Sequence, residues 1–173
     1  VLIVHAWAGR SPFEEDAARK RAGLGYAALA MDVYGKGVLG GDPEENTKLM
    51  SPFLEDRPML QNRLKTGLQV LRDQEETDAS KVAATGYCFG GLCVLDLART
   101  GEDFQGAASF HGLFNKPGNT DGNVIKAKVL ALHGWDDPMV PPADVVALAE
   151  ELTAAGADWQ IHGYGNTLHA FTN

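Results

Sequence analysis

Several features that would assign a protein class at once are missing from this 173-residue sequence. It has only two cysteines, Cys88 and Cys93, which excludes a disulfide framework and favours a reducing compartment such as the cytoplasm. It has no run of the ~18 apolar residues that a bilayer-spanning helix needs, so we expect no membrane insertion. Lys and Arg number 15 against 23 Asp and Glu, and the net charge of −8 disfavours nucleic acid and anionic membranes as partners.

The residues that are present alternate between short apolar runs and amphipathic stretches. The runs, typical of strands buried on both faces, are Val1–His5, Tyr26–Val33, Val82–Gly86, Gly106–Phe110, Val129–His133 and Trp159–His162. The stretches with helical spacing are Phe13–Ala22, Pro58–Gln74, Gly91–Arg99 and Ala143–Ala155. This alternation predicts a single α/β domain over residues 1–173, with a mostly parallel sheet and helices on both faces. For Tyr34–Arg57, rich in Gly, Pro and acidic residues, we expect an irregular loop that covers the functional site.

The hexapeptide GYCFGG follows one of the apolar runs and precedes a helical stretch. Its frame Gly86-x-Cys88-x-Gly90 is the nucleophile-elbow pattern with Cys in place of Ser, and the glycines prevent collisions at a strained turn. The start of the following helix favours a thiolate at Cys88, and the amide of Phe89 becomes an oxyanion donor. The alternative is a glycine-rich packing turn with an inert buried thiol. Cys93, among apolar helix residues, is expected in the core.

Chain order constrains the partners of such a nucleophile, because in this arrangement the acid follows the nucleophile and the histidine follows the acid. The segment LHGWDDPMVPP offers Asp136 and Asp137, of which the second is preferred because the proline after it keeps it out of the next helix. Of the histidines that follow, His162 lies at the end of an apolar run and His169 lies on a glycine-containing loop. We therefore predict that Asp137 orients His169 and that His169 pairs with the thiol of Cys88.

The loop after the first apolar run is the expected source of a second oxyanion donor. There the segment HAWAG makes the Trp7 amide the best candidate, with its indole ring as a wall of the pocket. His5 is either a ligand or, as we prefer, a hydrogen-bonded residue at the end of a strand. A metal site made from His5, His111, His133 and Asp136 is a rival interpretation, but the sequence has neither the two-His helical spacing nor the Cys pair of common metal sites.

Three segments in order, GYCFGG, LHGWDDPMVPP and YGNTLHAF, resemble the dienelactone hydrolase family of the α/β-hydrolase fold. The opening VLIVHAWAG…GYAALAMDVYG is similar to the early strands of that family, so the resemblance spans nearly the whole chain. It implies a triad of Cys88, Asp137 and His169, with oxyanion amides at Trp7 and Phe89. It also implies a cofactor-free enzyme that opens cyclic enol-lactones, and we expect a monomer or weak dimer.

The sequence departs from the family pattern in three ways. A family Glu that pairs with the resting thiol falls at Ala6, and an Arg that binds the substrate carboxylate falls at Asn173. A second substrate-binding Arg comes from the region of Arg57 or Arg63. Family members are also longer, so by this resemblance two edge strands and the final helix are expected to be missing.

These observations predict a hydrolase that cleaves small carboxylic esters or lactones through a thioester at Cys88, in the manner of a dienelactone hydrolase (carboxymethylenebutenolidase). Trp7 and Arg57 are the predicted substrate-binding residues, and no metal is expected. One alternative is a non-catalytic or truncated hydrolase-fold protein that binds a ligand without turnover. Another is a redox-sensing thiol at Cys88, which would not need Asp137 or the oxyanion amides.

Overall fold

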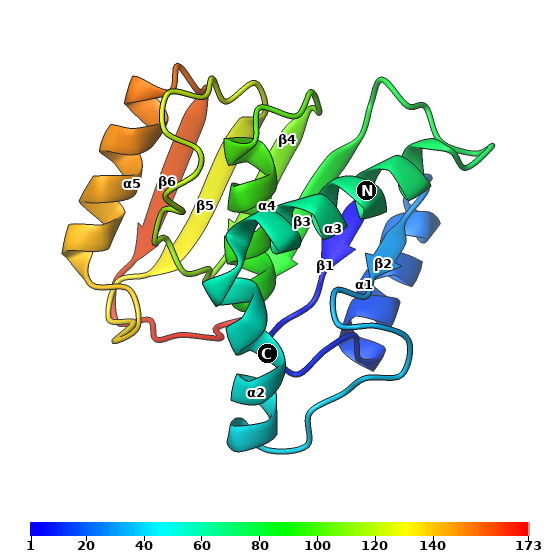
Figure 1. Ribbon diagram of the computed structural model, residues 1–173, viewed down its shortest axis with the longest axis horizontal. Coiled ribbons are helices and arrows are strands. Elements are labelled where there is room, and N and C mark those ends of the chain that lie inside the picture. The colour runs from blue at the N-terminus through cyan, green and yellow to red at the C-terminus, as the bar shows by residue number, and fades with distance from the viewer. Residues whose placement is uncertain (173) are drawn as a thin grey trace.

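The computed structural model describes residues 1–172 and contains a six-stranded sheet in which every neighbouring pair of strands is parallel (Figure 1). The strands, in their spatial order, are β2 (Leu29–Met31), β1 (Leu2–Val4), β3 (Ala83–Tyr87), β4 (Gly106–Phe110), β5 (Lys128–Gly134) and β6 (Trp159–Tyr164). Because all strands run the same way, their carboxyl ends meet at one edge of the sheet, the lower edge in Figure 1. The loops that leave this edge carry the residues of the candidate site.

Helices cover both faces of the sheet. They are α1 (Pro12–Gly23), α2 (Pro43–Glu55), α3 (Arg57–Arg72), α4 (Phe89–Arg99) and α5 (Pro142–Ala154). On one face, Ala17 of α1 packs with Ile3 in a small core. On the other face a larger core buries side chains of α3, α4 and α5, among them Leu64, Leu92 and Leu148. The predicted α/β architecture is therefore confirmed, and no helix within residues 1–172 combines the length and apolar character needed to cross a membrane.

Helix α3 illustrates how the sequence pattern becomes packing. Asp56 precedes the helix, and its side chain accepts a hydrogen bond from the Met59 amide at 2.9 Å, which satisfies one of the free N–H groups of the first turn. The leucines at helical spacing are all buried against the sheet and α4: Leu60, Leu64, Leu68 and Leu71. Burial of each leucine contributes roughly 1.5–3 kcal/mol to the free energy of folding.

The expected strands and helices are confirmed to within a few residues, but the irregular loop predicted for Tyr34–Arg57 is wrong over its second half. This half forms α2, which begins after Asp42, whose side chain accepts a hydrogen bond from the Glu45 amide at 2.9 Å. Phe53 is buried and stacks on Tyr34 with ring centroids 5.6 Å apart. One buried aromatic face and a capping aspartate thus make a helix from a segment whose composition indicates a loop.

Candidate active site

Cys88 lies at the turn between β3 and α4, with φ 54° and ψ −115°, a backbone conformation that residues other than glycine rarely adopt. A Cβ atom at Gly86 would lie 2.0 Å from the Gly90 carbonyl oxygen, and a Cβ atom at Gly90 would lie 2.2 Å from the Val4 carbonyl oxygen. Both positions therefore require glycine, because the backbone passes too close for any side chain. This is the strand-to-helix elbow that the sequence predicts.

The surroundings of the elbow hold Cys88 firmly. Its amide donates to the Phe110 carbonyl oxygen at 3.0 Å and approaches His111 Nδ1 at 3.2 Å. Helix α4 begins at Phe89, so the positive end of its dipole lies beside Cys88 and favours a negative charge on the sulfur. Within residues 1–172 the Phe89 amide has no hydrogen-bond acceptor, and it is available as a donor to a ligand.

Asp137 and His169 form a short polar contact in the site. Asp137 Oδ2 lies 2.7 Å from His169 Nδ1, and Oδ1 accepts a hydrogen bond from the Met139 amide at 2.9 Å. The Asp137 carboxylate is fully buried, so both of its oxygens are held in place. Because the imidazole donates to Asp137 from Nδ1, its Nε2 atom remains available for proton transfer. This atom is buried without a partner in the part of the chain that the structure describes.

The charge state of His169 follows from its two neighbours. Interaction with Cys88 is the largest influence, and together with the hydrogen bond to Asp137 it raises the pKa of His169 to about 9 against the opposing effect of burial. The contact with Cys88 lacks hydrogen-bond geometry, because Nε2 has no partner within residues 1–172. Because its pKa is about 9, the His169 ring is protonated on both nitrogens at neutral pH. The resulting imidazolium stabilises a thiolate on the neighbouring sulfur.

The alternatives for the acid and the base lie outside this arrangement. Asp136 is exposed, and His162 is exposed with its Nε2 atom 3.2 Å from Gln160 Oε1. The contact geometry thus favours Asp137 over Asp136 as the acid and His169 over His162 as the base.

Trp7 lies in the loop after β1 and lines the same cavity as Cys88. Its carbonyl oxygen accepts a hydrogen bond from the Tyr34 hydroxyl at 2.9 Å, whereas its amide has no acceptor among the described residues. The close approach of Gly90 to Val4 brings the end of β1 against the start of α4. The two amides that the sequence singles out, those of Trp7 and Phe89, therefore belong to segments in direct contact.

The cavity around these residues has a volume of about 400 Å³. It is lined by Ala6, Trp7, Ala8, Ser11, Phe13, Glu14, Tyr87, Cys88, His111, His169, Ala170 and Thr172. The lining within residues 1–172 includes neither Lys nor Arg, and besides its two histidines it contains three aromatic residues, Trp7, Phe13 and Tyr87. No residue of the segment 34–57 takes part, so the prediction that this segment covers the site gains no support. Instead the segment 34–57 contacts the loop after β1, where the Gly40 amide donates to the Ala8 carbonyl oxygen at 2.9 Å.

Glu14 is a site residue that sequence reasoning missed. It is only 2% exposed, and its Oε2 atom accepts hydrogen bonds from the Ser11 amide at 2.8 Å and hydroxyl at 2.7 Å. Its Oε1 atom lies 3.4 Å from the Ala6 amide. The sequence signal was present, since Ser11 and Glu14 have the spacing of a capping box, but that pattern alone marks only the start of a helix. A carboxylate thus lines the cavity although Ala6 itself supplies none.

His111 is the second residue that was missed. It lies beyond the end of β4 with φ 39°, and its Nε2 atom is 2.7 Å from Thr172 Oγ1. Its ring centroid lies 5.0 Å from that of His169. Burial, together with the neighbouring His169, lowers the pKa of His111 to about 4, so the ring is neutral at physiological pH. Chain order excluded this histidine as the base, and no sequence rule indicates that it contacts the elbow.

Arg57 does not line the cavity of Cys88. Its guanidinium binds the buried carboxylate of Asp96 with two hydrogen bonds, of 2.6 and 2.5 Å. Asp96 also pairs with Arg99, which in turn binds Glu151 at 2.8 Å. This network joins α3, α4 and α5 in the interior, and its geometry gives no support to the prediction that Arg57 binds substrate. The predicted role at Asn173 lies outside the described residues.

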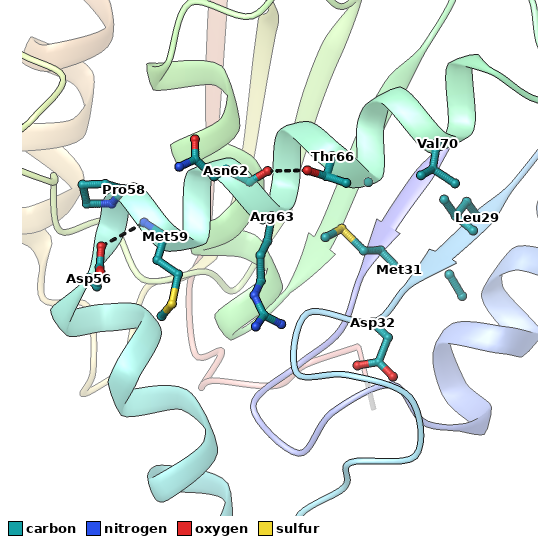
Figure 2. Close-up of a pocket in the computed structure, with 12 residues that line it drawn as sticks. Leu29, Met31, Asp32, Asp56, Pro58, Met59, Asn62, Arg63, Thr66 and Val70 are labelled. Carbon is teal, nitrogen blue, oxygen red and sulfur yellow. Dashed lines mark hydrogen bonds between the residues drawn. The ribbon is translucent and has the colours of Figure 1, made fainter.

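A larger cavity, of about 720 Å³, lies between β2 and α3, away from the elbow (Figure 2). Its charged side chains already have local partners: Asp56 caps α3, Asp32 accepts from the amides of Tyr34 and Gly35, and Arg63 donates to the Val33 carbonyl oxygen. None of the candidate catalytic residues lines it. The smaller cavity is therefore the candidate site, because it holds the strained cysteine and the paired histidine.

Cys93, His5 and His133, which the sequence also singled out, are buried and do not line the cavity of Cys88. Cys93 is fully buried, and burial raises the pKa of its thiol well above the ordinary value. His5 is buried and hydrogen-bonded through both ring nitrogens. His133 is fully buried beside Phe114, with ring centroids 5.4 Å apart. Within residues 1–172, no group of three or more His, Cys, Asp or Glu side chains has the arrangement of a metal site.

Comparison with known proteins identifies the family and the fold of the chain. The sequence model of the dienelactone hydrolase family matches residues 1–173. A crystal structure of a dienelactone hydrolase-like promiscuous phosphotriesterase from metagenomic libraries is 35% identical with a TM-score of 0.93, and the match covers 99% of this chain and 72% of that one. Thus the α/β-hydrolase topology expected from the sequence is confirmed.

Two curated relatives are more distant. The protein usf of Aquifex pyrophilus is 28% identical, over 100% of this chain and 76% of its own length. A Yersinia pestis relative with a provisional carboxymethylenebutenolidase name is 27% identical, over 99% of this chain and 67% of its own length.

Proposed function

The chain belongs to the dienelactone hydrolase family, and from this premise we propose that it is a cysteine hydrolase of small carboxylic esters or lactones. The observation that carries the proposal is the His169 ring, which lines the cavity of Cys88. Asp137 holds this ring at Nδ1, while Nε2 has no partner among residues 1–172. A histidine so oriented can move a proton to and from a reacting group.

The proposed reaction has two halves. The Cys88 thiolate attacks the acyl carbon, a C–S bond forms, and the carbonyl electrons move to an oxyanion that accepts hydrogen bonds from the Trp7 and Phe89 amides. When the carbonyl re-forms, the C–O bond breaks and the leaving alkoxide takes the proton from His169 Nε2. Water then gives a proton to His169 and attacks the thioester, and collapse of the second oxyanion releases the acid and the thiolate.

The lining of the cavity points to uncharged substrates. Glu14 is a buried carboxylate in its wall, and the described lining residues include no Lys or Arg to bind an anion. The aromatic rings of Trp7, Phe13 and Tyr87 offer apolar contacts to an acyl or alcohol group. We therefore propose neutral esters or lactones rather than carboxylate-bearing ones, with a cytoplasmic enzyme that is a monomer or weak dimer.

Hydrolysis of neutral phosphotriesters is a second candidate activity. It is favoured by the 35% identity to a protein described as a promiscuous phosphotriesterase, and by the uncharged character of such substrates. In this case the thiolate would attack phosphorus and form a P–S bond while the same two amides bind the phosphoryl oxygen. The P–O bond to the leaving alkoxide or phenoxide, which takes the proton from His169, would break. Water that gives a proton to His169 would then attack phosphorus and break the P–S bond, which releases the phosphodiester and the thiolate.

The test is hydrolysis of p-nitrophenyl acetate and of a dialkyl p-nitrophenyl phosphate by the wild type, Cys88→Ala and Cys93→Ala. We expect turnover of the acetate to fall by about 10³-fold or more in Cys88→Ala, because the nucleophile is lost, and to be retained in Cys93→Ala. If the folded wild type were no faster than Cys88→Ala on both substrates, the hydrolase proposal would fail and a ligand-binding role would take its place.

A redox-sensing thiol is separated from hydrolysis by His169→Ala. Hydrolysis requires His169, so kcat should fall by at least about 10²-fold in this variant. If peroxide oxidised Cys88 equally in the wild type and in His169→Ala while neither turned over an ester, the sensor interpretation would be supported instead.

A further inference from the structure

The peptide bond between Ala6 and Trp7 is held from its carbonyl side. The Ala6 carbonyl oxygen lies 2.6 Å from His5 Nδ1 and accepts a second hydrogen bond from the Gly9 amide at 3.2 Å. No peptide bond among the described residues is cis, so the C=O and N–H groups of this peptide point in opposite directions. Whatever fixes the Ala6 carbonyl therefore fixes the direction of the Trp7 amide.

The proton on His5 is located by its other contact. The Nε2 atom of His5 accepts a hydrogen bond from the Val33 amide at 3.0 Å, so this nitrogen carries no proton. Burial lowers the pKa of His5, which keeps the ring neutral, and the single proton of a neutral ring must then be on Nδ1. His5 is thus a donor to the Ala6 carbonyl oxygen in one fixed tautomer.

Two further backbone groups of this dipeptide have hydrogen-bond partners. The Ala6 amide approaches Glu14 Oε1 at 3.4 Å, and the Trp7 carbonyl oxygen accepts from the Tyr34 hydroxyl at 2.9 Å. Within residues 1–172 the Trp7 amide is the one backbone group of the two residues without a partner, and Trp7 lines the cavity of Cys88. A donor that is fixed before substrate binds needs no reorganisation in the transition state.

We propose that His5 is a positioning residue, which aims the Trp7 amide at the oxyanion by donating a hydrogen bond to the Ala6 carbonyl oxygen. The inference rests on the proposed hydrolase function, because it assigns His5 to the same reaction. It also makes a distinction within one side chain. The Nδ1 contact serves catalysis, whereas the Nε2 contact joins the end of β1 to Val33 in the segment after β2 and serves the fold.

Two substitutions separate these roles. His5→Asn places an amide nitrogen where Nδ1 lies and retains the donor to Ala6. His5→Gln extends an amide oxygen towards the position of Nε2 and retains the acceptor for Val33. The two variants have similar chemistry and each loses one hydrogen bond of the buried ring, so they are matched controls for each other.

The experiment measures kcat and KM for p-nitrophenyl acetate, the rate of Cys88 alkylation by iodoacetamide, and the thermal midpoint of each variant. Alkylation requires the nucleophile and its base but builds no oxyanion. We expect His5→Gln to lower kcat by about 10²-fold, the scale of one lost oxyanion donor, with KM and the alkylation rate within about twofold of the wild type. His5→Asn should keep kcat within about tenfold of the wild type.

Equal kcat values for the two variants, or a lower value for His5→Asn, would overturn the proposal. So would a parallel loss of alkylation in His5→Gln, because it would mean that the elbow itself is disturbed. Failure of the hydrolase function has a different signature, since the wild type would then turn over no faster than Cys88→Ala and the assignment of His5 would fall with it.

Discussion

Gly86 and Gly90 face each other so closely that a Cβ atom on Gly86 would lie 2.0 Å from the Gly90 carbonyl oxygen. Because that neighbour is backbone, it cannot move aside as a side chain does. We predict that Gly86→Ala lowers the free energy of unfolding by about 3 kcal/mol or more, measured by urea denaturation. Gly118→Ala is the control, since a Cβ atom there meets nothing within 4 Å, and it should change stability by no more than about 0.5 kcal/mol. Equal stability of the two variants would contradict the tight elbow.

The hydrogen bond between Asp137 and His169 predicts a large kinetic effect. Asp137→Asn should lower kcat for p-nitrophenyl acetate by about 10²- to 10⁴-fold, because the amide no longer holds the tautomer that keeps Nε2 available. Asp136→Asn, one residue away and exposed, should stay within about twofold of the wild type. Similar losses in both variants would remove the basis for choosing Asp137 as the acid.

The raised pKa of His169 predicts a pH-dependent contribution to stability. Since the pKa of His169 rises from an unfolded value near 6.5 to about 9, the protonated ring stabilises the fold fully below pH 6.5. This contribution is lost as the pH rises from 6.5 to 9. The difference in free energy of unfolding between the wild type and His169→Gln should therefore shrink across this range. A difference that is constant or grows over the same range would contradict the assigned protonation.

Glu14 is predicted to select against negatively charged substrates. In Glu14→Gln, kcat/KM for a p-nitrophenyl hemisuccinate should rise by about threefold to tenfold relative to p-nitrophenyl butyrate, because one negative charge leaves the cavity wall. Gln at this position still completes the capping box of α1. Glu15→Gln, whose side chain pairs with Arg10 outside the cavity lining, should leave the ratio unchanged. An unchanged ratio in Glu14→Gln would remove Glu14 from substrate selection.

The position of Arg57 predicts a loss of stability rather than of affinity. Arg57→Met leaves the Asp96 carboxylate with one cationic partner fewer in the interior, and should lower the free energy of unfolding by about 3–5 kcal/mol. KM values for the neutral and the anionic ester should stay within about twofold of the wild type under conditions in which the variant is folded. A selective rise of KM for the anionic ester, without loss of stability, would restore the substrate-binding role that the sequence suggested.

The geometry of the elbow and the contact between Asp137 and His169 follow from the sequence for a physical reason. Cysteine between two glycines after an apolar run leaves few structural options, and the order of the strands limits which Asp and His can reach it. Residues 88, 137 and 169 accordingly lie where the pattern indicates, with Asp137 and His169 in direct contact. The loop glycines and the proline after Asp137 act through local backbone preferences, which a sequence pattern can indicate without knowledge of distant contacts.

Other features depend on contacts that no local pattern contains. Arg57 is buried because Asp96, on another helix, accepts its hydrogen bonds, and a lone arginine in a sequence looks the same whether it faces a substrate or a carboxylate. Glu14 lines the cavity because the first turn of α1 lies beside the loop after β1, where its carboxylate meets the Ala6 amide. His111 contacts Cys88 because β3 and β4 are neighbours in the sheet, which becomes known only from strand order.

The distribution of the site over β3, β5 and β6 has a consequence during protein synthesis. Cys88 leaves the ribosome well before His169, and domains of this kind complete their sheet only when the last strand pairs. Until β6 docks on β5, the thiol lacks the neighbouring His169 ring and has only the start of α4 beside it. Thiol reactivity in a nascent or refolding chain therefore reports the arrival of the last strand, and a chain stalled before that step has an incomplete site.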